Sequence, residues 1–241
     1  MTIDVALWHR TRYRFARPVT LGPHIIRLRP APHTRTRILA YSLDVGPAAH
    51  RLHWLQDPFG NWQARVFFLE PADRLDVVVD LRAEMAVVDP FDFYVEPEAS
   101  QWPFAYDADL QEDLRPYLET ESVGPAFQAL LDTIPRDPAY TVTFLVGLNQ
   151  LLAERIGYVV RLEPGVQTLE ETLGLGSGSC RDTGWLLVQL CRQLGIAARF
   201  VSGYLIQLAG DADGSDGPAE DIPDLHAWAE VFLPGAGWIG L

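Results

Sequence analysis

The segment from Gly174 to Leu194, GLGSGSCRDTGWLLVQLCRQL, constrains the fold more than any other part of this chain. Glycine adopts backbone angles that other residues avoid, so the three glycines at positions 174, 176 and 178 predict a sharp turn. The apolar residues that follow would cover most of the circumference of a helix, which predicts a helix buried in a core. These residues are Trp185, Leu186, Leu187, Val188, Leu190, Cys191 and Leu194.

A cysteine lies where the predicted turn passes into the predicted helix. Ser179 fits the N-cap position and Asp182, three residues later, fits the first turn, so Cys180 takes the first helical position. Unpaired backbone N–H groups and the positive end of the helix dipole favour a thiolate there. Cys180 is therefore a candidate nucleophile, and its backbone N–H is a candidate oxyanion donor. The alternative is an inert buried cysteine.

The composition predicts a globular protein and excludes some classes of partner. The chain has 241 residues, of which 48% are hydrophobic, enough for one large domain or two ordinary ones. No apolar stretch has the length of a membrane span, and the first residues lack the apolar core of a secretion signal, so we expect a cytoplasmic protein. Residues 96–241 hold 22 of the 32 acidic residues, which argues against nucleic acid and membrane partners.

The sequence predicts neither a disulfide nor a metal or cofactor. Cys180 and Cys191 lie 11 residues apart on one predicted helix, about 16 Å, too far for a disulfide. Neither Cys-x-x-Cys nor paired Cys/His spacing suggests zinc, and the glycine turn lacks the Gly-Lys-Ser/Thr of a P-loop. Residues 211–222 begin like an EF-hand, but Asp216 and Ile222 stand where glycine and glutamate are required, so a solvated loop is favoured.

Residues 1–95 are predicted to form an antiparallel β-sandwich domain. Apolar residues alternate with polar ones in several short runs separated by turn residues, with little helix signal. Pro18 is expected to end the first strand, and arginines at alternating positions are expected to form a solvated sheet face or, alternatively, an anion-binding surface. The predicted strands are Val5–Phe15, Ile25–Arg29, Arg37–Val45, Leu52–Gln56, Trp62–Leu69 and Leu75–Val88.

The rest of the chain is predicted to be an ordered linker, 96–122, and a helical and β-stranded core, 123–241. The linker combines prolines and acidic residues with aromatic residues that a free linker would not need. Within the core, helical periodicity and capping residues alternate with strand-like runs. The predicted elements are helices at 124–134, 141–156 and from Thr168, the cysteine helix, and strands at 158–162, 197–208, 226–233 and 238–241.

One histidine is available to pair with Cys180 in the second half of the chain. The other five histidines belong to the N-terminal β region, whereas His226 is predicted to open a strand after a long loop. In that position its ring could face the start of the cysteine helix and accept the thiol proton. Taken without Cys180, a histidine at a strand start is commonly structural.

Three sequence blocks carry a resemblance to a known family. They are GSGSCRD at 176–182, GIAARFVSGY at 195–204 and HAWAEVFLPGAGW at 226–238. In order and spacing they resemble the bacterial transglutaminase-like cysteine protease family. TRYRF at 11–15, RLRP at 27–30 and DPFGN at 57–61 resemble the β-rich region that precedes this core in that family. The resemblance covers nearly the whole chain.

This resemblance implies an α+β fold with a papain-like core, in which a helix bearing the cysteine packs on an antiparallel sheet. It implies a Cys-His-Asp triad with Cys180 as nucleophile and His226 as general base and acid. The aspartate of the family falls beyond Leu241, so we expect this chain to be an N-terminal fragment whose activity is impaired by an unoriented imidazole. Asp182 is expected to cap the helix instead of completing the triad. Trp185 is expected in the core, and Trp228 in the wall of the cleft.

The predicted function is thiol-dependent hydrolysis of peptide or protein amide bonds, or acyl transfer from them, through an acyl-enzyme. The family resemblance favours hydrolysis over cross-linking. The alternative is a non-catalytic peptide-binding or scaffold module with the same fold. The sequence sets neither the substrate nor the oligomeric state.

Overall fold

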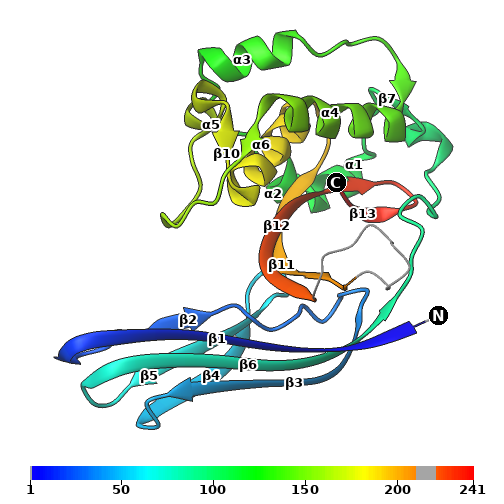
Figure 1. The fold of residues 1–241 in the computed structure, drawn as a ribbon. Coiled ribbons are helices and arrows are strands. Elements are labelled where there is room, and N and C mark those ends of the chain that lie inside the picture. Colours follow the sequence, from blue (N-terminus) through cyan, green and yellow to red (C-terminus); the bar gives the residue numbers. More distant parts are fainter. Residues whose placement is uncertain (1, 210–220) are drawn as a thin grey trace. The chain divides into compact units, whose positions relative to one another are not determined.

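The protein combines helices and antiparallel sheets in two separate units (Figure 1). The computed structural model describes residues 2–209 and 221–241. Unit 1 is Met1–Asp89 and unit 2 is Pro90–Leu241. The α+β fold class predicted from the sequence is confirmed. No helix in the described part of the chain is long and apolar enough to cross a membrane.

Unit 1 is a sandwich of antiparallel strands. Its described residues form a sheet of order β1–β6–β3 and a second of order β2–β5–β4. Side chains from both sheets, Phe68 and Leu75 among them, share one hydrophobic cluster, and Val66 and Val79 are fully buried. The strands are β1 (Thr2–Val19), β2 (His24–Ile26), β3 (Arg37–Gly46), β4 (His50–Gln56), β5 (Trp62–Phe68) and β6 (Ala72–Ala86).

The first strand continues past the proline that was expected to end it. β1 runs to Val19, and its pairing with β6 shifts register between Arg14 and Val19. Pro18 lies in this irregular part, where its missing N–H removes no regular ladder bond. The prediction that Pro18 ends the strand is therefore wrong.

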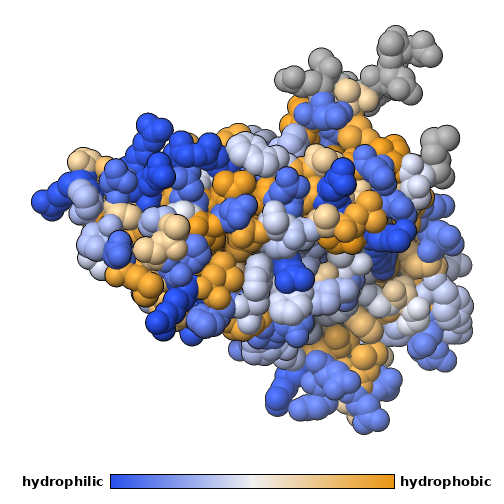
Figure 2. Space-filling model, turned by 90° about the horizontal axis from the view of Figure 1, so that it is seen from below, coloured by the Kyte–Doolittle hydropathy of each residue, from blue (hydrophilic) through white to orange (hydrophobic). Residues whose placement is uncertain are grey.

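The alternating arginines of β1 lie on an exposed surface, as the solvated-face interpretation predicts. Arg10 and Arg12 both pair with Asp76 on β6, with 3.1 Å between Arg10 Nη2 and Asp76 Oδ1. On the face of the molecule seen in Figure 2, hydrophilic residues are interspersed with hydrophobic ones. Arg10 and Arg12 thus share one carboxylate on the neighbouring strand, and the anion-binding alternative stays a prediction.

Unit 2 contains all the helices among the described residues. The stretch predicted as a linker belongs to this unit and includes a short 3₁₀ helix and two short α-helices, and Asp107 caps the first α-helix by accepting from the Leu110 N–H at 2.9 Å. The helical elements are η1 (Pro97–Ala99), α1 (Ala108–Asp113), α2 (Arg115–Leu118), α3 (Pro125–Asp132), α4 (Thr141–Arg155), α5 (Leu169–Leu175) and α6 (Cys180–Gln193). The strands are β7 (Gln101–Trp102), β8 (Ala139–Tyr140), β9 (Gly157–Tyr158), β10 (Ser177–Gly178), β11 (Ala198–Gln207), β12 (Ile222–Leu233) and β13 (Gly237–Gly240).

Helix α6 is the centre of unit 2. It packs on the antiparallel sheet β11–β12–β13 and contacts α4 and α5 (Figure 1). Leu186, Val188 and Leu190 on α6 are completely buried in one cluster with Val231 and Leu233 of β12. The buried cysteine helix that the sequence predicts is confirmed, and its packing fixes where Cys180 lies.

We expect Leu190→Ala to lower the free energy of unfolding by about 3 kcal/mol, because it leaves a cavity in the centre of this core. Denaturant unfolding of the purified protein measures the change. Leu175→Ala is the matched control, since Leu175 is 66% exposed and its loss should cost less than about 0.5 kcal/mol. Equal effects of the two substitutions would contradict the central position of α6.

Candidate active site

Cys180 is the first residue of α6, as predicted; its thiol is free, and the residue is partly exposed. Its N–H belongs to the first turn, where N–H groups have no partner within the helix. The second thiol is different, because Cys191 is completely buried and burial raises the pKa of the Cys191 thiol to about 12. Cys180 is thus the cysteine suited to react with a substrate.

The carboxylate of Asp182 organises the chain around Cys180. It accepts from the Ser179 N–H at 2.8 Å and the Ser179 hydroxyl at 2.7 Å. It also accepts from the Gln167 N–H at 2.7 Å and from Arg161 Nε at 2.9 Å. With all these donors engaged and its side chain fully buried, Asp182 has the structural role that the sequence predicts.

The same contacts keep Asp182 ionised. Burial by itself would raise the pKa of the Asp182 carboxyl, but hydrogen bonds from Gln167 and Ser179 and the charge of Arg161 outweigh it and hold that pKa below its usual range. An ionised group at this position also interacts favourably with the positive end of the α6 dipole. Asp182 therefore stabilises the start of α6 in the form that carries Cys180.

Two glycines of the predicted turn are required by geometry. Gly176 follows α5 with a φ of +59°, in the left-handed region that glycine favours. A Cβ on Gly178 would lie 2.8 Å from Cβ of Asp182, closer than side-chain carbons can pack. The sharp turn predicted before Cys180 is confirmed, and it allows Asp182 to approach the backbone.

His226 lies inside a strand and does not open one, contrary to the prediction. β12 begins at Ile222, and His226 pairs with Gly203 on β11. The His226 ring stacks loosely with the Trp228 indole, with centroids 6.5 Å apart and planes at 21°. The acidic segment expected before the strand lies largely outside the described residues, whereas Ile222 and its neighbours are already paired with β11.

A polar chain holds the indole beside His226. Trp228 Nε1 donates to Glu230 Oε1 at 3.3 Å, and Glu230 forms an ion pair with Arg199 at 2.6 Å. A Cβ on Gly203 would lie 2.8 Å from Trp228 Cη2, so the indole covers this glycine. The Trp228 indole is thus held in place beside the His226 imidazole, on the same face of the sheet. Trp228 is the residue that the sequence predicts in the wall of the cleft.

Helix α6 and strand β12 run in the same direction. Near the middle of α6, a Cβ on Gly184 would lie 3.6 Å from Cα of Trp228. Near its end, Arg192 Nε donates to the carbonyl of Ala198 at 3.0 Å, and Ala198 is paired with Val231 of β12. The contact nearer the end of α6 is therefore also the one further along β12, so the two elements run in the same direction.

This direction brings the two candidate catalytic residues to the same level. Cys180 precedes Gly184 by four residues, about 6 Å along a helix, and His226 precedes Trp228 by two residues, about 7 Å along a strand. Both therefore lie at the amino-terminal end of the α6–β12 pair. The predicted pairing of thiol and imidazole requires this arrangement.

The burial pattern of β12 indicates the direction of the His226 side chain. Ala229 and Val231 are buried in the cluster with α6, so strand alternation directs His226 and Trp228 to the other face of the sheet. Among the described residues, no hydrogen bond joins Cys180 and His226. Pairing with Cys180 would require the His226 imidazole to turn toward the start of α6, so the pairing stays a prediction.

The loop before α5 borders Cys180 on another side. β9 pairs in parallel with β10, and the Val159 N–H donates to the Gly178 carbonyl at 3.0 Å. Arg181 Nη2 donates to the carbonyls of Arg161 and Glu163 at 3.1 and 3.0 Å. Of the strand predicted at 158–162, only the beginning forms, because the following residues turn toward Arg181 and Asp182.

The described residues contain no group of three or more His, Cys, Asp or Glu side chains arranged to hold a metal ion. The acidic stretch compared with an EF-hand, 211–217, lies outside those residues.

Sequence reasoning missed the residues that support the site. Arg161 and Gln167 reach Asp182 from a loop whose course no local pattern indicates. Glu230 lies on the same strand face as Trp228, whose indole N–H donates to it. Its partner Arg199 could have been found by aligning the alternation of the two strands, which pair Arg199 with Glu230.

The fold and the cysteine at the start of a buried helix define a class of thiol-bearing α+β proteins, and comparison with known families identifies it. Residues 129–241 match the transglutaminase-like superfamily, and residues 5–84 match the bacterial transglutaminase-like N-terminal region. Together these matches span most of the sequence. Residues 129–241 belong to the transglutaminase-like superfamily, and residues 5–84 match the N-terminal region found in its bacterial members.

Individual relatives share both parts of the chain. The uncharacterized protein Rv2569c of Mycobacterium tuberculosis is 28% identical over 253 residues, covering 97% of this chain and 76% of its own length. Mb2599c of Mycobacterium bovis gives the same values. The crystal structure of a candidate cysteine protease from Cytophaga hutchinsonii has a TM-score of 0.67 at 19% identity, covering 100% of this chain and 78% of its own. At that identity the likeness shows a shared fold.

We expect Asp182→Asn to lower the free energy of unfolding by about 3 kcal/mol at pH 7, because it removes one member of a buried charge pair. Since the pKa of Asp182 is lowered in the folded state, its contribution is complete above the usual carboxyl pKa, about 4, and is lost as the pH falls through the lower folded value. The difference between variant and wild type should therefore shrink below about pH 4.

Denaturant unfolding from pH 7 to pH 3 tests this, with Asp137→Asn at an exposed position as the control. A difference that stays constant over this range would contradict the assigned ionisation of Asp182.

Proposed function

We propose that the protein is a thiol-dependent hydrolase or acyltransferase that acts on peptide or protein amide bonds through an acyl-enzyme. The observation that carries this proposal is the common level of Cys180, at the start of α6, and His226, within β12, in a transglutaminase-like core.

In the proposed first step, Cys180 Sγ attacks the carbonyl carbon of the amide while His226 accepts the thiol proton. The carbon–sulfur bond forms, and the negative oxygen accepts a hydrogen bond from the Cys180 backbone N–H at the start of α6. His226 then gives its proton to the amine nitrogen as the carbon–nitrogen bond breaks. The amine leaves, and the acyl group remains on sulfur.

In the second step, water attacks the thioester carbonyl and His226 accepts its proton. The carbon–sulfur bond breaks, the acid leaves, and the proton returns to Cys180. An amine in place of water would give acyl transfer, and the family resemblance favours water. Trp228, fixed by Glu230, supplies an apolar surface against which the imidazole can be oriented.

We expect Cys180 to react with iodoacetamide at pH 6 at least tenfold faster than glutathione does, because a neighbouring imidazole would accept the thiol proton. Peptide mapping by mass spectrometry separates Cys180 from Cys191. His226→Ala should reduce the rate to that of a free thiol, and His33→Ala, at an exposed position in unit 1, should leave it unchanged. A wild-type rate equal to that of glutathione would overturn the proposal.

A second candidate is a non-catalytic peptide-binding module. The observation that favours it is the placement of His226 on the sheet face away from the packing surface of α6. Peptide binding that persists in Cys180→Ala, together with an unreactive thiol in the wild type, would support this function over catalysis.

A further inference from the structure

The segment from Tyr158 to Val166, YVVRLEPGV, exposes an unusual number of apolar side chains. Leu162 is 91% exposed and Val160 76% exposed, and Tyr158, Val159 and Val166 are exposed as well. A single exposed apolar residue is normal on a protein surface, but a contiguous group commonly marks a binding surface. All five exposed side chains are aliphatic or aromatic, and they differ chiefly in size.

Polar contacts hold this segment from underneath. Its Arg161 is mostly buried and donates to Asp182, and the Val159 N–H donates to the Gly178 carbonyl. Arg181 holds the carbonyls of Arg161 and Glu163. The polar groups of the segment are thus used in anchoring it, while its apolar side chains face solvent.

The anchors are the neighbours of the candidate nucleophile. Gly178, Arg181 and Asp182 lie within two residues of Cys180, on both sides of it in the sequence. The exposed apolar group is therefore fixed beside Cys180, whereas β12 and His226 approach α6 from the sheet. An acyl group attached to the Cys180 sulfur would therefore contact either the exposed apolar group or the residues around His226.

The charged side chains of the segment contribute little to ionic recognition of a ligand. Arg161 is engaged by Asp182 and lies 3.9 Å from Glu163, so the two opposite charges of the segment largely compensate each other. Contact with this surface would depend on the apolar area removed from water. The whole chain carries a net charge of −13, which also disfavours an acidic ligand.

We propose that the exposed apolar side chains of residues 158–166, with Val160 and Leu162 as principal contacts, bind an apolar side chain of the acyl-donating substrate next to the bond that Cys180 attacks. This inference rests on the proposed function, because it names the substrate class of the same site. Val160 and Leu162 act as specificity-determining residues: they favour substrates with an aliphatic or aromatic group at that position.

The test compares two alkylating reagents on the intact chain. Iodoacetamide is small and polar, whereas N-benzyl iodoacetamide carries an apolar ring. The rate constant at Cys180 with each reagent is divided by the rate constant of glutathione with the same reagent, and the ratio of the two quotients gives the apolar preference. We expect a preference of about tenfold, the size expected for burying a small apolar group.

Substitutions in residues 158–166 test whether this segment causes the apolar preference. Leu162→Ser and Val160→Ser should each lower the preference by about threefold and leave the iodoacetamide rate unchanged, while Leu162→Met should retain it. Leu69→Ser, the same change at an exposed leucine between β5 and β6, is the matched control and should have no effect. Circular dichroism checks that each variant folds.

The outcomes separate this inference from the proposed function. A reactive Cys180 without apolar preference overturns the inference alone, and an apolar preference at a thiol no faster than glutathione supports the surface but removes the catalytic function. A preference that Leu162→Ser and Val160→Ser leave unchanged also overturns the inference. A preference that disappears as protein concentration rises, with dimers in sedimentation, would assign the surface to a second copy of the chain and overturn it.

Discussion

The buried carboxylate of Asp182 is the interaction on which the site depends. This carboxylate accepts hydrogen bonds from Ser179, the N-cap residue before Cys180, from the Gln167 N–H and from the guanidinium of Arg161. Removing a charge pair from water is costly, and it is tolerated here because every neighbouring donor points at the carboxylate. As a result, the turn before α6, the first turn of α6 and the loop at 161–167 form one connected structure around the candidate nucleophile.

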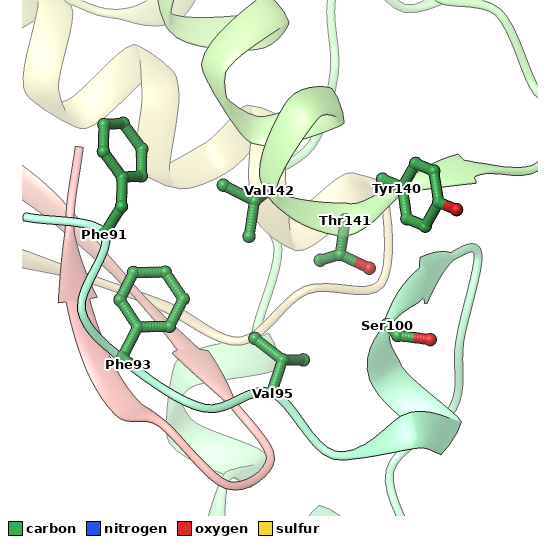
Figure 3. A pocket seen from close by; sticks show the side chains of 7 residues that line it. All are labelled: Phe91, Phe93, Val95, Ser100, Tyr140, Thr141 and Val142. Carbon is green, nitrogen blue, oxygen red and sulfur yellow. The ribbon is translucent and has the colours of Figure 1, made fainter.

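The rest of unit 2 fixes the direction in which that structure faces. The apolar side of α6 packs on β11 and β12, and α6 and β12 run in the same direction, so the start of the helix lies at the level of His226, within β12. Figure 3 shows a different surface feature of the unit, a cavity of about 310 Å³ between the segment of Phe91, Phe93 and Val95 and the start of α4 at Thr141. Its lining is mainly apolar, and the Thr141 hydroxyl donates within the protein to the Ala99 carbonyl.

Local patterns predicted most elements because they depend on short-range physics. The alternation of β3 and β5, the helix start at Thr168, and the apolar circumference of α6 each reflect interactions within a few residues, and each is confirmed. The predictions for Pro18 and for the start of β12 were wrong because pairing with β6 and β11 continued strands past the point where local propensity would stop them.

The sequence by itself determined the position of Cys180 at the first turn of a buried helix, because glycine, capping residues and apolar periodicity act locally, and its resemblance to a known family indicated the fold class and the superfamily. Only the tertiary structure decided that Arg161 and Gln167 complete the contacts of Asp182, and that His226 stands at the level of Cys180 with its ring beside Trp228. These contacts join residues distant in the chain, and their geometry depends on strand register and helix direction, which no local pattern encodes.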